Sequence, residues 1–387
     1  MALLALPPAG TASAAAKPSP NWAAPQIRAV LAHGLMGGPA VTDFRPNDPL
    51  TRQTLADLVL GLDQLLAPPA TAEEAPPTES PPAAGYGGGT ARSQSSTQSQ
   101  TAAPPATAPE PLATPAVAPA VARPDAAVTL SGLDARLVSS LGLSGAAAEF
   151  ARGAAGAGLK VPARFGTEAV ARLLGLRTNH PAPLDGLELR PNDPATRAEA
   201  AYSAAQILGF GWLGNSWQTA GVQALADSFA LPQLDPWQQR ILTVAFSKIG
   251  MPYVWGGTSD GVETPAGVTA RGGYDCSGFV WRVYKLQAYP DEGDLASTLQ
   301  GRTTYQMSGE APRAERIPFA QLQPADVIFF GDRGPRSTPA QVEHMGIYVG
   351  NGWFIHSSDY GVALAQLTGW YRQNFAWGRR PLREAGL

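Results

Sequence analysis

Residues 67–126 constrain this chain most, because they cannot form a folded core of their own. The stretch is built largely from Pro, Ala, Thr, Ser, Gly and Gln and has almost no large apolar side chain. Such a composition cannot bury enough apolar surface to offset the entropy that is lost when a chain becomes ordered. We therefore predict a disordered, partly extended linker over 67–126, with folded regions on either side.

The start of the chain is apolar and small. Residues 1–16 contain Ala12-Ser13-Ala14, which fits a small-x-small cleavage site. No basic residue precedes the apolar run and prolines interrupt it, so residues 1–19 are either a truncated secretory signal or a flexible tail. We favour the signal, and hence a secreted bacterial protein at the cell wall or cell surface. No later stretch reaches the roughly 18 apolar residues of a membrane span.

The charge balance argues against one class of partner. Charged residues make up 15% of the 387 residues, and the net charge is −3. Since the sequence contains no basic stripe, we do not expect the protein to bind nucleic acid.

An eight-residue motif occurs on both sides of the predicted linker. Residues 45–52 (RPNDPLTR) recur as residues 190–197 (RPNDPATR), with seven of eight positions identical. Apolar residues follow each copy at helical spacing, which predicts a helix that begins at the end of each motif. Thr51 and Thr196 are suitable N-caps for these helices.

Arg52 and Arg197 would occupy the first helical position after these caps. A cation at that position opposes the helix dipole and stabilises nothing locally. The two arginines therefore indicate either an anionic ligand or a buried ion pair, and spacing alone does not separate the two.

The motif and its surroundings resemble the S-layer homology (SLH) family. The residues that carry the resemblance are Asn21-Trp22-Ala23, Ile27, Leu31, Gly34-Leu35-Met36-Gly37-Gly38 and Phe44-Arg45-Pro46-Asn47. The match is good over 20–66 and returns in the later half of a second unit near 177–210. We expect an all-α, degenerate SLH-like region over 127–230, with no Thr-Arg motif in its middle unit at 128–176. The resemblance implies that Arg52 and Arg197 bind an anionic secondary cell-wall polymer.

Cys276 is the only cysteine of the chain. One thiol can form neither an internal disulfide nor a thiolate zinc site, which leaves an inert thiol or a nucleophile. A nucleophile needs a base, and His344 and His356 lie downstream. Asp275 resembles an N-cap that places Cys276 at the first position of a helix, where the dipole should lower the thiol pKa below about 8.5. The Asp275 carboxylate works against this shift unless capping or substrate occupies it.

The two histidines flank a predicted β-hairpin. A two-residue Asn351-Gly352 turn would place them on opposite faces of the sheet. A three-residue loop over 350–352, with Gly352 left-handed, would pair His356 with Gly346 and bring both imidazoles to one face. We predict the three-residue loop.

No further ligand at suitable spacing completes a metal site with these histidines, and zinc needs three or four ligands. We interpret His33 and His180 as structural residues. We therefore predict neither a metal nor another cofactor.

Residues 236–387 resemble the NlpC/P60 family of papain-like cysteine peptidases. The matching blocks are Pro252-Tyr253-Val254-Trp255-Gly256-Gly257, Asp275-Cys276-Ser277-Gly278-Phe279, Leu322-Gln323-Pro324-Ala325-Asp326-Val327, His344-Met345-Gly346-Ile347-Tyr348 and Ile355-His356. The resemblance implies an α+β fold in which the nucleophile helix packs on an antiparallel sheet. It also implies cleavage of peptidoglycan stem peptides, typically between γ-D-glutamate and a diamino acid.

Roles follow by position from this resemblance. Cys276 attacks the amide, His344 takes the thiol proton and His356 orients His344. Tyr253 and the Cys276 amide serve the oxyanion, while Asp275 and Ser277 resemble the residues that receive the free amino end of the stem peptide.

Two positions depart from the family pattern. The loop over 258–273 is long and borders the groove. Glu343 replaces a small polar residue next to His344, but it should point to the opposite face of the strand.

The main prediction is a secreted peptidoglycan endopeptidase held at the wall by SLH-like repeats. Two alternatives stay open: a wall-binding structural protein with an inactive peptidase domain, and a thiol acyltransferase or amidase of the same fold.

Overall fold

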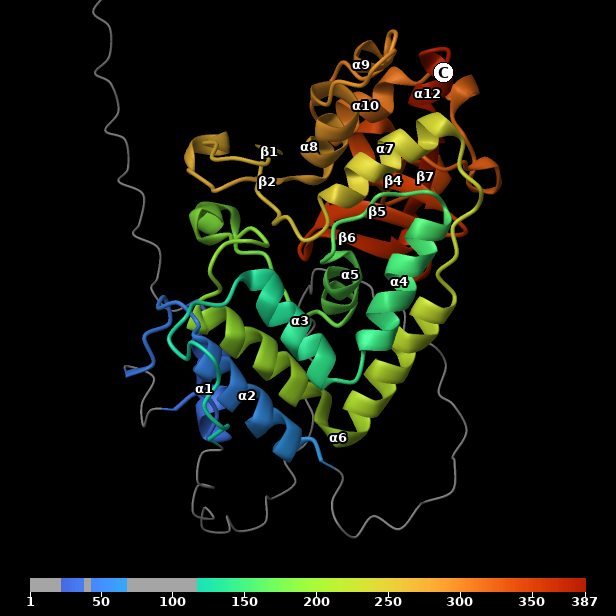
Figure 1. Ribbon diagram of the computed structural model, residues 1–387. Helices are drawn as coiled ribbons and strands as arrows, with labels where there is room; N and C mark the ends of the chain where they lie inside the picture. The colour runs from blue at the N-terminus through green and yellow to red at the C-terminus, as the bar shows by residue number, and fades with distance from the viewer. Residues whose placement is uncertain (1–21, 38–42, 68–116) are drawn as a thin grey trace, which may run out of the picture.

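The computed structural model describes residues 22–37, 43–67 and 117–387. The predicted signal-like tail over 1–19 and residues 68–116 of the predicted linker lie outside them. The described chain forms a helical region and a sheet region that pack side by side (Figure 1). Within these ranges, no helix is both long enough and apolar enough to span a membrane.

Over the described residues, the helical region consists mainly of α-helices, with short 3-10 turns and isolated β-bridges. Its elements are α1 (Ala24–Ala32), α2 (Arg52–Leu65), α3 (Leu130–Ser140), α4 (Ser144–Gly156), α5 (Phe165–Leu173), η2 (Ala182–Leu187) and α6 (Arg197–Asp227), which is interrupted at Gly211. The predicted caps are confirmed: the hydroxyls of Thr51 and Thr196 accept the amides of Thr54 and Glu199.

Three chain segments join in a ring of backbone hydrogen bonds just before α2, α3 and α6. The Leu50 N–H donates to Ala195 O (2.7 Å), the Ala195 N–H to Val128 O (2.8 Å), and the Val128 N–H to Leu50 O (2.9 Å). Thr129 caps α3 as Thr51 and Thr196 cap the other two helices. The region therefore has an approximate threefold arrangement of three related units.

The middle unit begins earlier than the sequence indicated. Residues 123–129 take the place of 45–51 in the first unit, and Arg123 has a left-handed backbone (φ 54°) as Arg45 does (φ 49°). Leu130 stands where the other units have Arg52 and Arg197. The opening motif of this unit escaped recognition because only its Arg-Pro pair and its threonine match the other two copies.

Part of the range predicted as linker packs on α2. The Gln53 amide donates to Ala118 O and its oxygen accepts the Val121 N–H, while Asp57 accepts the Ala118 N–H. Residues 117–126 thus belong to the helical region.

The sheet region contains a five-stranded antiparallel sheet in the order β6-β5-β4-β3-β7. Its strands are β3 (Val327–Gly331), β4 (Val342–Gly350), β5 (Trp353–Ser358), β6 (Gly361–Gln366) and β7 (Phe375–Arg379). A two-stranded ribbon, β1 (Thr258–Ser259) with β2 (Gly273–Tyr274), precedes it. The α-helices are α7 (Pro236–Ser247), α8 (Cys276–Trp281), α9 (Leu295–Thr298), α10 (Thr304–Glu310), α11 (Gly369–Asn374) and α12 (Pro381–Glu384), and a π-helical turn, η4 (Arg282–Leu286), follows α8.

The β4–β5 hairpin differs from the prediction in its loop and agrees with it in its register. The turn has two residues, Asn351 and Gly352, both with positive φ (48° and 79°), and a bulge lies between Tyr348 and Gly350. The predicted three-residue loop was therefore wrong. Because the bulge adds one residue to β4, Ile347 still pairs with Ile355, the register that the three-residue loop would also give.

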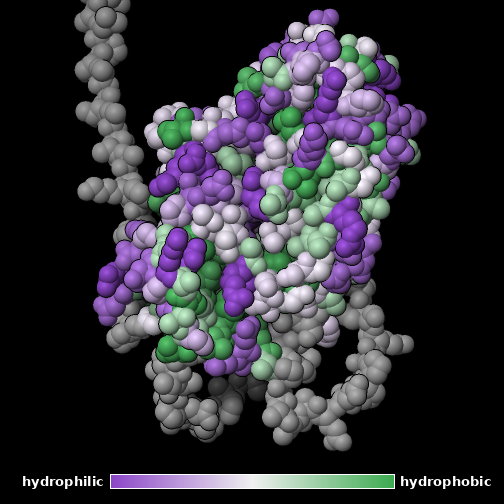
Figure 2. All heavy atoms as spheres, viewed as in Figure 1, coloured by the Kyte–Doolittle hydropathy of each residue, from purple (hydrophilic) through white to green (hydrophobic). Residues whose placement is uncertain are grey.

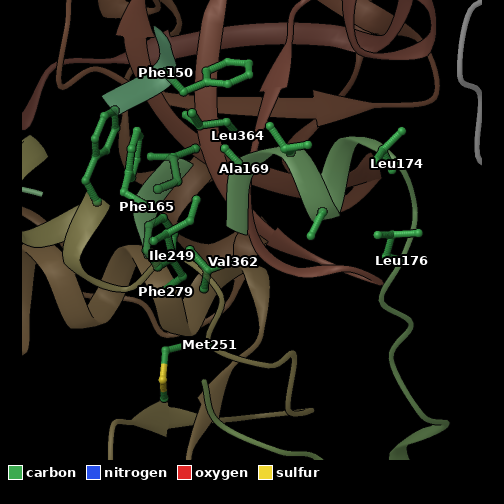
Figure 3. Close-up of a cluster of buried hydrophobic side chains, with 14 of the residues drawn as sticks. Phe150, Phe165, Ala169, Leu174, Leu176, Ile249, Met251, Phe279, Val362 and Leu364 are labelled. Atoms are coloured by element: carbon green, nitrogen blue, oxygen red, sulfur yellow. The ribbon is translucent and has the colours of Figure 1, made fainter. Parts of the chain in front are cut away.

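The two regions share one hydrophobic core. The cluster in Figure 3 includes Phe165 and Ala169 of α5 together with Val362 and Leu364 of β6 and Phe279 of α8. Aromatic rings extend this contact, since Phe165 stacks on Phe246 of α7 at 4.9 Å between centroids. On the face shown in Figure 2, hydrophilic and hydrophobic residues are interspersed over both regions.

Candidate active site

Cys276 lies at the start of α8, as predicted. Asp275 is the N-cap, and its carboxylate accepts the Gly278 N–H. The helix packs on the face of the sheet that carries Met345 and Ile347. The thiol is therefore fixed at the end of a helix whose far side is anchored in the core.

The sulfur is almost enclosed, with Cys276 only 8% exposed. It lies 3.7 Å from Thr304 Oγ1, and the backbone amides of Ser277 and Met345 also hydrogen-bond to it. Burial, followed by the negative charge of Asp275, raises the pKa of the Cys276 thiol to about 11, although these hydrogen bonds lower it. The predicted fall of this pKa was wrong, because the six-residue helix cannot offset the loss of solvent around the sulfur.

His344 and His356 lie on the other face of the sheet and touch. His344 Nε2 is 2.7 Å from His356 Nδ1, and the rings are nearly perpendicular (79°). Phe330 stacks on His344, while Phe354 and Tyr371 pack around the buried His356. Burial lowers the pKa of His344 to about 4, so its imidazole is neutral at neutral pH.

Gly346 permits this contact. A Cβ at this position would meet Ile355 O at 2.8 Å and the Cβ of His356 at 3.0 Å. Any larger residue would push β5, and with it His356, away from β4.

The thiol contacts the backbone of β4 directly beside His344, and no hydrogen bond joins it to the His344 imidazole. The sulfur accepts the amide of Met345, the residue directly after His344. Since His344 Nε2 is bonded to His356, Nδ1 is the ring atom left for the thiol proton. Catalytic hydrogen bonds are often long in ligand-free enzymes and tighten in the substrate complex.

Arg302, like Thr304, is a residue of this site that sequence reasoning missed. Its guanidinium bonds both carboxylate oxygens of Asp275 (3.2 Å each) and the Ser277 hydroxyl (2.7 Å). It also donates to the carbonyls of Gly256 and Gly257. Nothing in its spacing marks it, because it lies 26 residues after Cys276 in a polar segment before α10.

The same network occupies the two residues predicted to receive an amino group. Besides Arg302, Asp275 accepts the Gly256 N–H and the Ser277 hydroxyl. Asp275 and Ser277 thus have a structural role in the free protein, and their contact with substrate stays a prediction.

Gly278 lets the segment over 253–257 lie directly against α8. A Cβ on Gly278 would come within 1.9 Å of Gly257 O and 2.8 Å of Arg302 Nη2. The segment carries the half-buried Tyr253. Burial, with the negative charges of Cys276 and nearby aspartates, raises the pKa of Tyr253. Its hydroxyl therefore stays protonated and can donate a hydrogen bond to an oxyanion.

The two predicted polymer-binding arginines differ in their surroundings. Arg52 is exposed, with one long hydrogen bond to Ala122 O. Arg197 is half-buried, bonds the carbonyls of Phe44 and Met36, and packs over the Phe44 ring. It lines a pocket of about 200 Å³ together with residues 34–37, Thr54, Asp57 and Val117. Of the two arginines, Arg197 and not Arg52 lines this pocket.

No group of three or more potential metal ligands occurs in the described ranges. His33 bonds the carbonyl of Ala29, and His180 pairs with Glu188 inside the helical region.

Comparisons with known proteins match both predicted regions. Residues 250–380 match the NlpC/P60 family, and residues 16–56 match the S-layer homology domain. Murein DD-endopeptidase MepH of Escherichia coli is 34% identical over 151 residues, 37% of this chain and 46% of the relative. The γ-D-glutamyl-L-lysine dipeptidyl-peptidase of Bacillus subtilis is 28% identical over 123 residues, 31% of this chain and 32% of the relative.

An NlpC/P60 family protein from Bacillus cereus of known structure is 24% identical, with a TM-score of 0.29 over 40% of this chain and 42% of that one. The chain therefore spans less than half of the length of these relatives. The predicted resemblance to both families, and the α+β fold after a helical region, are confirmed.

Proposed function

We propose that this protein is a cell-wall peptidoglycan endopeptidase that uses Cys276 as its nucleophile. The observation that carries the proposal is a thiol at a helix start that accepts the Met345 amide of β4, where the neighbouring His344 belongs to a pair of bonded imidazoles. The NlpC/P60 match and the murein endopeptidases among the relatives support the substrate class.

The reaction begins with the transfer of the Cys276 proton to Nδ1 of His344 as the sulfur attacks the amide carbon. His344 then carries a proton on both nitrogens, and its Nε2–H donates to His356 Nδ1. His356 must be neutral to accept it, and burial keeps the pKa of His356 well below its usual value. The tetrahedral oxyanion would receive hydrogen bonds from Tyr253 and the Cys276 amide.

Collapse of this intermediate breaks the C–N bond. The leaving amine takes the proton from His344, and a thioester remains on Cys276. Water then attacks the thioester with His344 as base, which releases the acid product and restores the thiol.

The bond we propose is the amide between γ-D-glutamate and a diamino acid. A relative whose name gives γ-D-glutamyl-L-lysine as its substrate supports this choice. Asp275 and Ser277 would bind the free amino end of the stem peptide, in exchange for part of their contact with Arg302.

The helical region would hold the enzyme at the wall, in keeping with its S-layer homology match. Arg197 and its pocket are the better candidate for an anionic wall polymer, although Asp57 also faces that pocket. In a sacculus pull-down, Arg197→Ala should reduce binding more than Arg52→Ala does. Equal binding by wild type and both variants would make the arginines structural. We propose a secreted, surface-associated location on the same grounds.

The test is digestion of purified sacculi with analysis of the released fragments by mass spectrometry. Wild type should release peptides that begin with the diamino acid and leave D-glutamate on the glycan, and Cys276→Ala should release none. Cleavage at another amide would be consistent with the mechanism but would contradict the proposed choice of bond.

A catalytically inactive wall-binding protein is the second candidate. It is favoured by one observation, the hydrogen bond of the thiol to Thr304 in place of His344. Intact sacculi after prolonged digestion with wild-type protein would support it.

A further inference from the structure

The threefold arrangement of the helical region places a groove between successive units. Between the third and first units, Arg197, the loop over 34–37 and Thr54 form the pocket described above. The equivalent positions between the middle and third units are Leu130, the loop over 177–179 and Glu199. These residues also line one groove, so the two grooves correspond.

The sheet region fills the second groove. Tyr253 and Pro252 form part of its wall, together with Tyr360 and Gly361 of the β5–β6 turn. The cavity that remains is only about 20 Å³, room for about one water molecule. Where the first groove has an arginine, the second has the apolar Leu130, which is 4% exposed. The second groove is therefore a docking surface for the sheet region rather than a ligand pocket.

A hydrogen bond from outside this docking surface joins the helical region to the segment that precedes the nucleophile helix. Asp185 of η2 is 2% exposed, and its Oδ2 accepts the Trp255 N–H at 2.8 Å. Its neighbour Gly186 lies against Thr269 of the long loop over 258–273, where a Cβ would be 3.1 Å from the Thr269 carbonyl. The helical region thus contacts both segments that flank the thiol.

Trp255 lies inside the segment over 253–257, which is held from two sides. Arg302 and Asp275 bind its Gly256–Gly257 end from the sheet region. Asp185 binds its middle from the helical region, across 70 residues of sequence. Without Asp185, the Trp255 N–H would lose the hydrogen bond that ties this segment to the helical region.

We propose that Asp185 is a positioning residue of the active site: it holds the Tyr253–Gly257 segment, so that the helical region is a structural part of the catalytic unit. The proposal rests on the proposed function for its kinetic consequence, whereas its structural consequence is independent of that function. Asp185 acts as a hydrogen-bond acceptor for a backbone amide and needs no charge to do so.

The kinetic consequence concerns kcat more than KM. Tyr253 is placed to serve the oxyanion, which exists only after attack, so a displaced segment weakens the transition state more than substrate binding. A displacement of about 1 Å can lower a rate about a hundredfold. We expect Asp185→Ala to lower kcat about tenfold to a hundredfold with KM changed less than threefold.

The experiment compares Asp185→Ala and Asp185→Asn in the full chain. Asparagine can still accept the Trp255 N–H, so Asp185→Asn should restore kcat to within about threefold of wild type. Asp125→Ala, which removes an exposed carboxylate of the same region, is the matched control and should equal wild type. Thermal unfolding of each variant identifies any that fails to fold.

Amide hydrogen exchange of the peptide over 253–257 gives the second readout. Asp185→Ala should lose protection at Trp255, and Asp185→Asn should keep it. If wild type cleaves no peptidoglycan, the proposed function fails, but this exchange pattern still tests the positioning role. Wild-type protection and wild-type kcat in folded Asp185→Ala would overturn the inference. A loss of kcat that asparagine does not restore would overturn the acceptor role, because charge would then be required.

Discussion

Arg302 offers the sharpest test of how the site is held together. The guanidinium joins Asp275 and Ser277 of the nucleophile helix to the carbonyls of Gly256 and Gly257. Arg302→Ala removes this bridge. Asp275 then keeps three donors, which are the Ser277 hydroxyl and the N–H groups of Gly256 and Gly278.

The magnitude follows from burial. Charge-assisted hydrogen bonds contribute about 1.5–3 kcal/mol each, but several bonds made by one group are not additive. The Arg302 side chain is 30% exposed and that of Asp275 is 14%, so water replaces part of what is lost. We expect a loss of about 2–3 kcal/mol in the free energy of unfolding.

Catalysis should suffer more than stability. Gly257 O lies against α8, so release of this segment alters the position of Tyr253 relative to the thiol. The expected fall in kcat for cleavage of a defined muropeptide is about a hundredfold. Arg302→Lys should fall between wild type and alanine, since an ammonium can pair with Asp275 but cannot bridge two carbonyls at once.

The measurements are chromatographic rates on one muropeptide and chemical denaturation of each variant. Arg313→Ala removes an exposed arginine beyond α10 and serves as the control. Wild-type kcat and wild-type stability in Arg302→Ala would refute the reasoning.

Three further predictions follow from the site. The rate of cleavage should stay level between about pH 5 and 9 and fall below about pH 4–5. The reason is that His344, with its pKa lowered to about 4, accepts a proton only while it is neutral. A midpoint near 6.5 in the pH–rate profile would contradict this. Alkylation of Cys276 by iodoacetamide should be slow at pH 7 and rise about tenfold per pH unit towards 10, because burial raises the thiol pKa to about 11; fast labelling that is constant from pH 6 to 8 would show a preformed thiolate. Gly346→Ala should lower the free energy of unfolding by about 1–3 kcal/mol and reduce activity, because the added Cβ would press on Ile355 and His356. An unchanged unfolding midpoint would show that β5 moves aside without loss of stability.

The sequence predicted the elements that carry strong local signals. Thr51, Thr196 and Asp275 were recognised as caps because short polar side chains before apolar, helix-periodic runs have few other uses. The hairpin register was also predicted, although its loop was not, because a two-residue turn with a bulge and a three-residue loop give the same pairing.

What the sequence could not give depends on contacts between distant segments. Arg302 and Asp185 act on residues 25 or more positions away, and no local pattern reports such a partner. The thiol pKa was mispredicted for the same reason, since a helix start is visible in sequence but the burial of its first residue is not. The start of the middle unit at Arg123 was missed because its helix begins with Leu130 in place of arginine.

The most direct test of the account is the intact mass of the protein after rapid mixing with a stem peptide and acid quench. We predict a transient adduct with the mass of the N-terminal acyl fragment, mapped by fragmentation to Cys276 and absent in Cys276→Ala. Cleavage of the same peptide by Cys276→Ala at the wild-type rate would contradict the central claim that this sulfur is the nucleophile.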